Sequence, residues 1–197
     1  MVNNIFISGV GGQGIITASR IISGAFFEAG FDVKKAEIHG LSQRGGSVVS
    51  QIRYGDKVFS PIIPKAKCEH VLSLEKMETL RYMELYNSKT RFVINDLKML
   101  PITVSSGKFD YPENVKDILF SRGINDIKLI DADAMAKKEF SDSRMANTIL
   151  IGVMSSSIDI DENNWISSIH KNIKNKYIEK NIQAFKLGKK YGVENVK

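Results

Sequence analysis

A glycine-rich segment near the start of the chain has the residue types and spacing of an anion-binding loop. Gly9, Gly11 and Gly14 fit the pattern G-x-G-x-x-G, with Gly12 and Gln13 in the two positions before the last glycine. Glycines permit a sharp turn, and they let backbone N–H groups approach a phosphate at the positive end of the helix that follows. The segment predicts a phosphate-bearing ligand. Close packing of a helix on a strand is the alternative explanation of these glycines.

An acidic residue lies where a dinucleotide-binding fold would place one. Glu37 ends a predicted strand 23 residues after Gly14, about where a carboxylate binds ribose in such folds. The spacing leaves NAD or FAD open as the ligand. A P-loop is excluded, because Ile15 and Ile16 stand where that motif needs lysine and then serine or threonine.

A second glycine-rich loop, residues 39–47, follows the strand that carries Glu37. Its candidate site residues are Ser42, Gln43, Arg44, Gly45 and Gly46. Open α/β sheets bind ligands beyond the carboxyl ends of their strands, and this loop is predicted to lie there. The planar guanidinium of Arg44 suits a phosphate or a carboxylate. Docking onto a partner protein and a simple ion pair with a surface acid are the alternatives for Arg44.

The elements that must position these loops alternate between strand and helix patterns. The strands are predicted at residues 4–8, 32–38, 47–53, 58–60, 71–74, 91–95 and 127–131. The helices are predicted at residues 15–29, 75–86, 114–122, 132–140, 144–156, 162–173 and 179–191. The first strand, helix and second strand read as a βαβ unit with parallel pairing. A hairpin turn at residues 54–57 predicts that 58–60 returns beside 47–53.

We therefore expect an α/β, Rossmann-like fold: a mainly parallel twisted sheet with flanking helices and an inserted antiparallel hairpin. A length of 197 residues predicts a single domain over 1–197. The C-terminal helices, about 144–192, are expected to pack on the sheet or on a partner.

Composition excludes several classes of function. The chain has one cysteine, Cys68, so it cannot form an internal disulfide or bind an iron–sulfur cluster by itself. The longest apolar run, 148–154, is far shorter than a membrane span, and no signal peptide is recognisable. We expect a cytoplasmic protein without a metal site. The net charge of +6 is concentrated in the C-terminal helices, where it reads as a solvated face and not as a nucleic-acid surface.

Several segments, in order along nearly the whole chain, resemble the gamma subunit or domain of 2-oxoacid:ferredoxin oxidoreductases. Within that family the resemblance is greatest to the small (beta) subunits of the indolepyruvate type. The segments are 9–14, 37–47, 51–53, 60–61, 144–147 with 150–152, and 181–185 with Gly188. Residues 100–130 carry no family signature.

The resemblance implies a division of labour within an enzyme complex. Such complexes oxidatively decarboxylate 2-oxoacids to acyl-coenzyme A, with thiamine diphosphate and Mg²⁺, iron–sulfur clusters and ferredoxin as the final electron acceptor. It implies that a large partner subunit holds thiamine diphosphate and the clusters, and that this chain is a non-catalytic subunit holding none of them. It also links this type of subunit to coenzyme A. On its own the chain is expected to be inactive and could form a homodimer.

The candidate binding set joins both glycine loops with one residue from the C-terminal half. Asn147 lies in an otherwise apolar helix, where its amide needs a polar partner. The predicted cofactor-binding residues are Gly9, Gly11, Gly12, Gln13, Gly14, Glu37, Ser42, Gln43, Arg44, Gly45, Gly46 and Asn147. Glu75, Glu78 and Arg81 read as surface pairs on a helix. A stand-alone NAD(P)-binding oxidoreductase is the alternative function, and an interaction module with merely structural glycines is a third.

Overall fold

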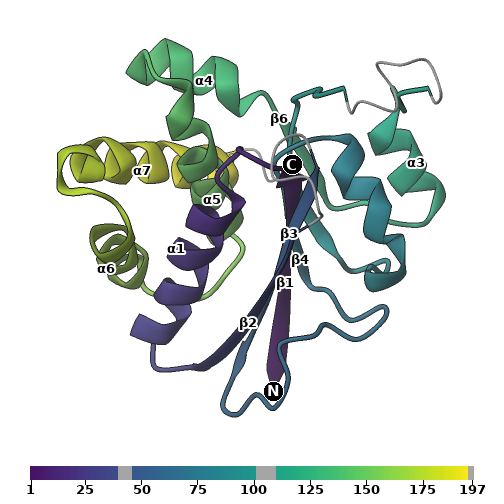
Figure 1. Cartoon of the computed structure of the whole chain (residues 1–197), viewed down its shortest axis with the longest axis horizontal. Helices are drawn as coiled ribbons and strands as arrows, with labels where there is room; N and C mark the ends of the chain where they lie inside the picture. Colours follow the sequence, from purple (N-terminus) through teal and green to yellow (C-terminus); the bar gives the residue numbers. More distant parts are fainter. Residues whose placement is uncertain (40–45, 101–109, 195–197) are drawn as a thin grey trace.

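The computed structural model describes residues 1–39, 46–100 and 110–194, and it is an α/β fold built on one six-stranded sheet (Figure 1). The strands are β1 (Val2–Val10), β2 (Asp32–His39), β3 (Ser47–Gly55), β4 (His70–Ser73), β5 (Arg91–Asn95) and β6 (Ile127–Ile130). Their order across the sheet is β2-β3-β1-β4-β5-β6. The pairs β1–β4, β4–β5 and β5–β6 are parallel, whereas β3 is antiparallel to both of its neighbours. The expected fold class is confirmed.

The predicted pairing of the first two strands is wrong, because β3 lies between β1 and β2. The antiparallel hairpin is formed by β2 and β3, and no strand forms at 58–60. Val48, Val49 and Ile52 of β3 are buried, so this strand is apolar toward both faces and takes an interior position. β2 carries Lys34 and Lys35, whose charges are compatible only with the solvated edge.

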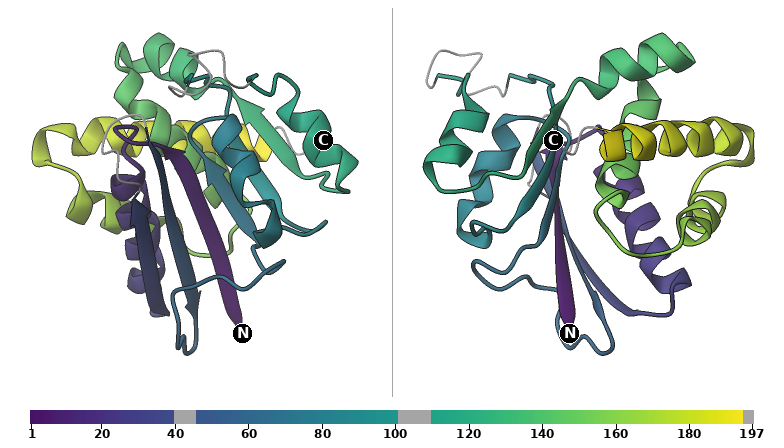
Figure 2. Two further views of the ribbon diagram at one scale, coloured as in Figure 1. Left: turned by 45° about the vertical axis from the view of Figure 1, so that its right-hand side comes forward. Right: turned by 180° about the vertical axis from the view of Figure 1, so that it is seen from behind.

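Helices cover the two faces of the sheet unequally (Figures 1 and 2). One face is covered by α1 (Ile15–Glu28), α5 (Ala146–Ser155), α6 (Glu162–Asn172) and α7 (Ile178–Glu194). The other face carries α3 (Val115–Ser121) and η1 (Met77–Leu85). The remaining elements are α4 (Ala132–Phe140), η2 (Ser143–Met145) and η3 (Asn175–Tyr177).

The helix predicted over 75–86 is instead the 3₁₀ segment η1, which is kinked at Tyr82. The Glu75 side chain accepts a hydrogen bond from the N–H of Glu78 and is buried. Burial of that carboxylate fixes the start of η1 against the end of β4. Local periodicity alone did not reveal this constraint.

Glycines let α5 and α7 pack at close range. A Cβ on Gly188 would lie 1.9 Å from the carbonyl oxygen of Ile149, and a Cβ on Gly152 would lie 2.1 Å from that of Phe185. Trp165 of α6 stacks on Phe185 with ring centroids 5.8 Å apart. This rigid helical layer forms the wall against which the glycine loop lies. Among the described residues, no helix has both the length and the apolar character needed to span a bilayer.

Candidate functional site

The first glycine loop lies at the carboxyl end of β1 and leads into α1. Gly12 and Gly14 have φ angles of 99° and 83°, which L-residues with side chains rarely adopt. Gly14 is the N-cap of α1 and offers no side chain, so the first backbone N–H groups of the helix face the surroundings of the loop. The N–H of Gly11 donates to the carbonyl oxygen of Gly46 over 2.8 Å, so the first loop contacts the end of the second.

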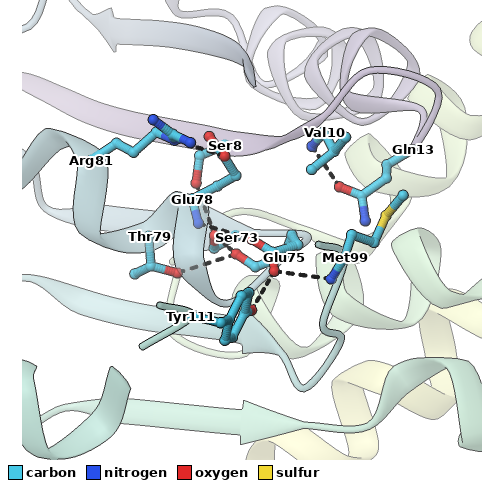
Figure 3. Close-up of polar contacts among 10 residues, drawn as sticks. All are labelled: Ser8, Val10, Gln13, Ser73, Glu75, Glu78, Thr79, Arg81, Met99 and Tyr111. Atoms are coloured by element: carbon cyan, nitrogen blue, oxygen red, sulfur yellow. Dashed lines mark hydrogen bonds and ion pairs between the residues drawn. The ribbon is translucent and has the colours of Figure 1, made fainter. Parts of the chain in front are cut away.

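Gln13 holds the loop on the sheet. Its Oε1 accepts a hydrogen bond from the N–H of Val10 over 2.6 Å (Figure 3). Its Nε2 donates to the carbonyl oxygen of Leu74 over 3.1 Å. A Cβ on Gly9 would approach Oε1 of Gln13 to 2.7 Å, so this amide position requires glycine there. Both ends of the Gln13 amide are engaged within the protein. Gln13 therefore holds the loop against the ends of β1 and β4.

Asn147 joins the loop to the helical layer. Its Nδ2 donates to the carbonyl oxygen of Gln13 over 2.5 Å, from the first turn of α5. A Cβ on Gly14 would lie 2.9 Å from that nitrogen. The polar partner expected for Asn147 is thus the loop backbone, 134 positions away in the sequence.

A cavity of about 510 Å³ lies beside the loop. Its walls are Gly12–Gly14 with the first turns of α1, the segment 143–148 with Ile151, and the segment 172–174 with Tyr177 and Asn181. Leu74, Asn95, Leu97 and Asp133 close one end. A cavity of this size, largely apolar with a few polar groups, is typical of a small-molecule site.

Arg144, Lys174 and Tyr177 line another part of the cavity. Arg144 Nε and Nη2 donate to the two carboxylate oxygens of Asp142 over 2.8 and 2.7 Å, and these hydrogen bonds lower the pKa of Asp142 to about 2. The guanidinium lies 5.1 Å from the ring centroid of Tyr177. Hydrogen bonds from Lys176 and then Arg144 lower the pKa of the Tyr177 phenol, as expected for a group in a positive field.

The other end of the cavity carries an amide and a carboxylate. Asn95 ends β5, and its Nδ2 donates to Oδ2 of Asp133 over 2.9 Å while its Oδ1 accepts from the N–H of Ala132 over 3.1 Å. Asn95, Asp133 and Tyr177 were not singled out from the sequence. The signal for the first two was available, because Asn95 ends β5 and Asp133 lies in the first turn of the helix that follows β6, both at the carboxyl edge of the sheet.

The prediction that Glu75 and Glu78 lie on the surface is wrong, although Glu78 does form the predicted kind of ion pair with Arg81. Glu75 and Glu78 are 0% and 1% exposed, and Glu78 Oε1 accepts from Arg81 Nε over 2.7 Å. The Glu75 carboxylate accepts from the N–H groups of Glu78 and Met99 and from the Tyr111 hydroxyl (Figure 3).

This buried network lies on the face of the sheet opposite the cavity. Burial, and then the hydrogen bond to Glu75, raise the pKa of Tyr111. The donors to the Glu75 carboxylate come from three separate segments of the chain. Glu75 therefore joins β4, η1 and the segments around Met99 and Tyr111.

Of the remaining predicted residues, one contacts the first glycine loop, one lies away from it, and the others fall outside the described residues. Gly46 contacts the first loop, whereas Ser42, Gln43, Arg44 and Gly45 lie outside the described residues. Glu37 lies on the edge strand β2, separated from β1 by β3, and pairs with Lys35 over 2.9 Å. The structure does not bring Glu37 to the glycine loop. Cys68 is fully buried, and burial raises the pKa of its thiol.

A family model and the relatives with similar sequences identify the same family. Residues 4–191 match the family model described as pyruvate ferredoxin/flavodoxin oxidoreductase. The chain is 34% identical over 195 residues to indolepyruvate oxidoreductase subunit IorB of Thermococcus kodakarensis, covering 97% of this chain and 96% of that one. It is 35% identical over 188 residues to IorB of Archaeoglobus fulgidus, covering 94% and 92%.

Solved structures share the fold. The gamma subunit of a keto/oxoacid ferredoxin oxidoreductase from Geobacter sulfurreducens superposes with a TM-score of 0.72 at 18% identity, covering 98% of this chain and 99% of that one. A 2-oxoglutarate:ferredoxin oxidoreductase from Magnetococcus marinus, solved with 2-oxoglutarate, coenzyme A and succinyl-CoA bound, gives a TM-score of 0.75 at 20% identity. All of this chain aligns there with 32% of a longer chain, so the same fold occurs as one part of a larger polypeptide.

Proposed function

Because this chain belongs to the pyruvate ferredoxin/flavodoxin oxidoreductase family, we propose that it is the non-catalytic gamma-type subunit of a 2-oxoacid:ferredoxin oxidoreductase. The substrate is proposed to be indolepyruvate or a related aryl pyruvate, which is oxidatively decarboxylated to its acyl-coenzyme A. The curated relatives, which are named indolepyruvate oxidoreductase subunits and match along almost their whole length, support this choice. The whole chain, 1–197, is taken as one domain of this type, acting in the cytoplasm.

The redox cofactors are assigned to a large partner subunit. One cysteine cannot supply the thiolates that an iron–sulfur cluster needs, and among the described residues no three His, Cys, Asp or Glu side chains are grouped as metal ligands. The residues present therefore do not fit a cluster. Thiamine diphosphate with Mg²⁺, the clusters and the transfer of electrons to ferredoxin belong, in this proposal, to the partner.

The observation that carries a role for this chain is the cavity beside the glycine loop. It combines the positive end of α1, the glycines Gly12 and Gly14, and the lining cations Arg144 and Lys174. Coenzyme A is the member of the reaction with phosphates and a long, flexible arm. We therefore propose that the cavity binds coenzyme A and presents it to the active site of the partner. The Magnetococcus enzyme, which was solved with coenzyme A bound, is consistent with this assignment.

Titration of the purified chain, and of the complex recovered through a tag on it, tests the proposal. A ligand that binds only the folded state stabilises it by about 2.7 kcal/mol at a hundredfold excess over Kd. Coenzyme A is expected to raise the melting temperature, and NAD and NADP are not. Stabilisation by NAD or NADP would favour a dehydrogenase instead. A complex that shows no response to coenzyme A would refute the cavity assignment.

A pair of variants connects binding to the cavity. Thr17 lies on its wall and is exposed, so Thr17→Trp fills the space without disturbing the core. Ile16 is the neighbouring exposed residue on α1 and does not line the cavity, so Ile16→Trp is the matched control. Coenzyme A binding is expected to be lost only in Thr17→Trp.

A further inference from the structure

The segment 56–67, between β3 and β4, divides its apolar residues between the core and the solvent. Val58 and Ile63 are buried, each 3% exposed, whereas Phe59 is 85% exposed and Ile62 is 51% exposed. The segment begins where β3 ends, at the amino end of β1 (Figure 2). It is therefore at the opposite end of β1 from the glycine loop and the cavity.

Side chains of β3 hold this segment in place although it forms no strand. Nη1 of Arg53 donates hydrogen bonds to the carbonyl oxygens of Ser60 and Ile62 over 3.0 and 3.2 Å. The N–H of Ile63 donates to Oε1 of Gln51 over 2.7 Å. These bonds satisfy backbone groups that a strand would have paired, and they keep the two exposed apolar side chains directed away from the core. An apolar residue on a backbone that is already ordered loses little further entropy when it binds a partner.

The exposed charge of the segment is positive. Its lysines, all of them exposed, are Lys57, Lys65 and Lys67. Its only carboxylate, that of Asp56, is paired with the N-terminal ammonium group over 2.9 Å. The ammonium group of Lys57 lies 5.1 Å from the centroid of the Phe59 ring, so a cation borders the exposed aromatic side chain. Two copies of this segment brought face to face would repel each other, whereas a partner surface with carboxylates would be attracted.

We propose that Phe59, Ile62 and Lys57 form the docking surface for the large partner subunit, which receives the Phe59 ring in an apolar pocket bordered by carboxylates. The proposal rests on the proposed function and adds to it the face of this chain that meets the partner. Protein interfaces are commonly centred on a few apolar or aromatic side chains that fill a pocket and are surrounded by polar contacts. The segment supplies both parts of that arrangement.

Phe59→Ser, with Phe27→Ser as its matched control, tests this surface. Phe27 is 70% exposed on α1, so each substitution removes an exposed phenyl ring and leaves the core intact. The chain is co-expressed with the large subunit, and the recovered complex is diluted and followed by sedimentation velocity. Phe59→Ser is expected to raise the dissociation constant about tenfold or more, because it removes the anchor of the interface. Phe27→Ser is expected to leave the dissociation constant unchanged.

A second pair of variants tests the carboxylates assigned to the partner. Lys57→Glu reverses a charge beside Phe59, and Lys138→Glu makes the same change at an exposed position on α4. Association of the full chain with the large subunit is expected to be slower for Lys57→Glu, and the difference should shrink as the salt concentration rises. Equal slowing by Lys138→Glu would show that only the net charge of the chain matters, and it would overturn the assignment of carboxylates.

The outcomes separate the docking surface from the proposed function. A complex that forms equally well with Phe59→Ser would overturn the surface and leave the function standing. Failure of the native chain to form any complex with the large subunit would overturn both. If Phe59→Ser dissociated a dimer of this chain and left the complex intact, the surface would belong to a second copy and the proposal would be wrong. Weakening by Phe59→Ser alone, with both variants melting at the native temperature, would establish the surface.

Discussion

Substitution of Gly14 by alanine tests how the loop is held against the helical layer. The residue has φ of 83°, and the added methyl would lie 2.9 Å from Nδ2 of Asn147. That nitrogen donates to the carbonyl oxygen of Gln13. Gly12 is the matched control, because its φ is 99° but a methyl there would meet nothing within 4 Å.

The two substitutions share one cost and differ in another. An L-residue in the left-handed region costs roughly 1–2 kcal/mol, which the lower entropy of the unfolded chain offsets by about 0.4–1 kcal/mol. Gly14→Ala also displaces the Asn147 amide, and the hydrogen bond it breaks is worth about 0.5–1.5 kcal/mol. We therefore expect Gly14→Ala to destabilise the chain by about 1 kcal/mol more than Gly12→Ala.

Urea unfolding of the purified chain measures this difference, and a double-mutant cycle assigns it. In an Asn147→Ala background the hydrogen bond is already absent, so the two glycine substitutions should cost the same. Equal effects of Gly12→Ala and Gly14→Ala in the native background would refute the reasoning. So would an excess for Gly14→Ala that persists without Asn147.

Two further predictions concern buried groups outside the cavity. Tyr111→Phe removes a hydrogen bond to the buried Glu75 carboxylate and is expected to lower the free energy of unfolding in urea by about 1.5–3 kcal/mol. The control is Tyr86→Phe, which should cost little because the buried Tyr86 hydroxyl has no partner among the described residues. Equal losses in the two variants would contradict the role given to Glu75. Burial, and then Arg91, lower the pKa of His70 to about 4, below its value of about 6.5 in the unfolded chain, so the unfolded state binds the proton first. The free energy of unfolding is therefore expected to fall by up to about 3 kcal/mol as the pH drops from 6.5 to 4. The His70→Asn variant should lose the part of this pH dependence that lies between pH 6.5 and 5. If the native protein showed no pH dependence in that range, His70 would be solvated and the reasoning refuted.

The sequence predicted the features that depend on local patterns. The strand at 91–95 and the helix at 132–140 occur at the predicted bounds, because each has a clear periodicity and a defined start. The glycine loop between a strand and a helix was also predicted, since its glycines are required by backbone angles within the loop itself. The family resemblance is carried by the same short segments.

Strand order was decided by the tertiary structure. The segments 2–10 and 32–39 have the pattern of a βαβ unit whether or not another strand separates them. The apolar character of β3 on both faces placed it between them, and this separation moved Glu37 away from the loop. The interior position in a sheet goes to the strand that buries the most apolar surface there. Finding that strand requires comparing the buried apolar surface of segments far apart in the sequence, which no local pattern contains.

The candidate site was likewise only partly visible in the sequence. Its cavity depends on Asn147 reaching Gln13 across 134 positions and on Lys174 and Tyr177 being brought beside α1. Glu75 reads as a surface residue from helical spacing, yet it is buried because donors from three segments converge on it. Local patterns specify backbone conformation through sterics and periodicity. Which polar groups become buried partners is decided when the layers pack, because a buried charge requires its donors and these come from anywhere in the chain.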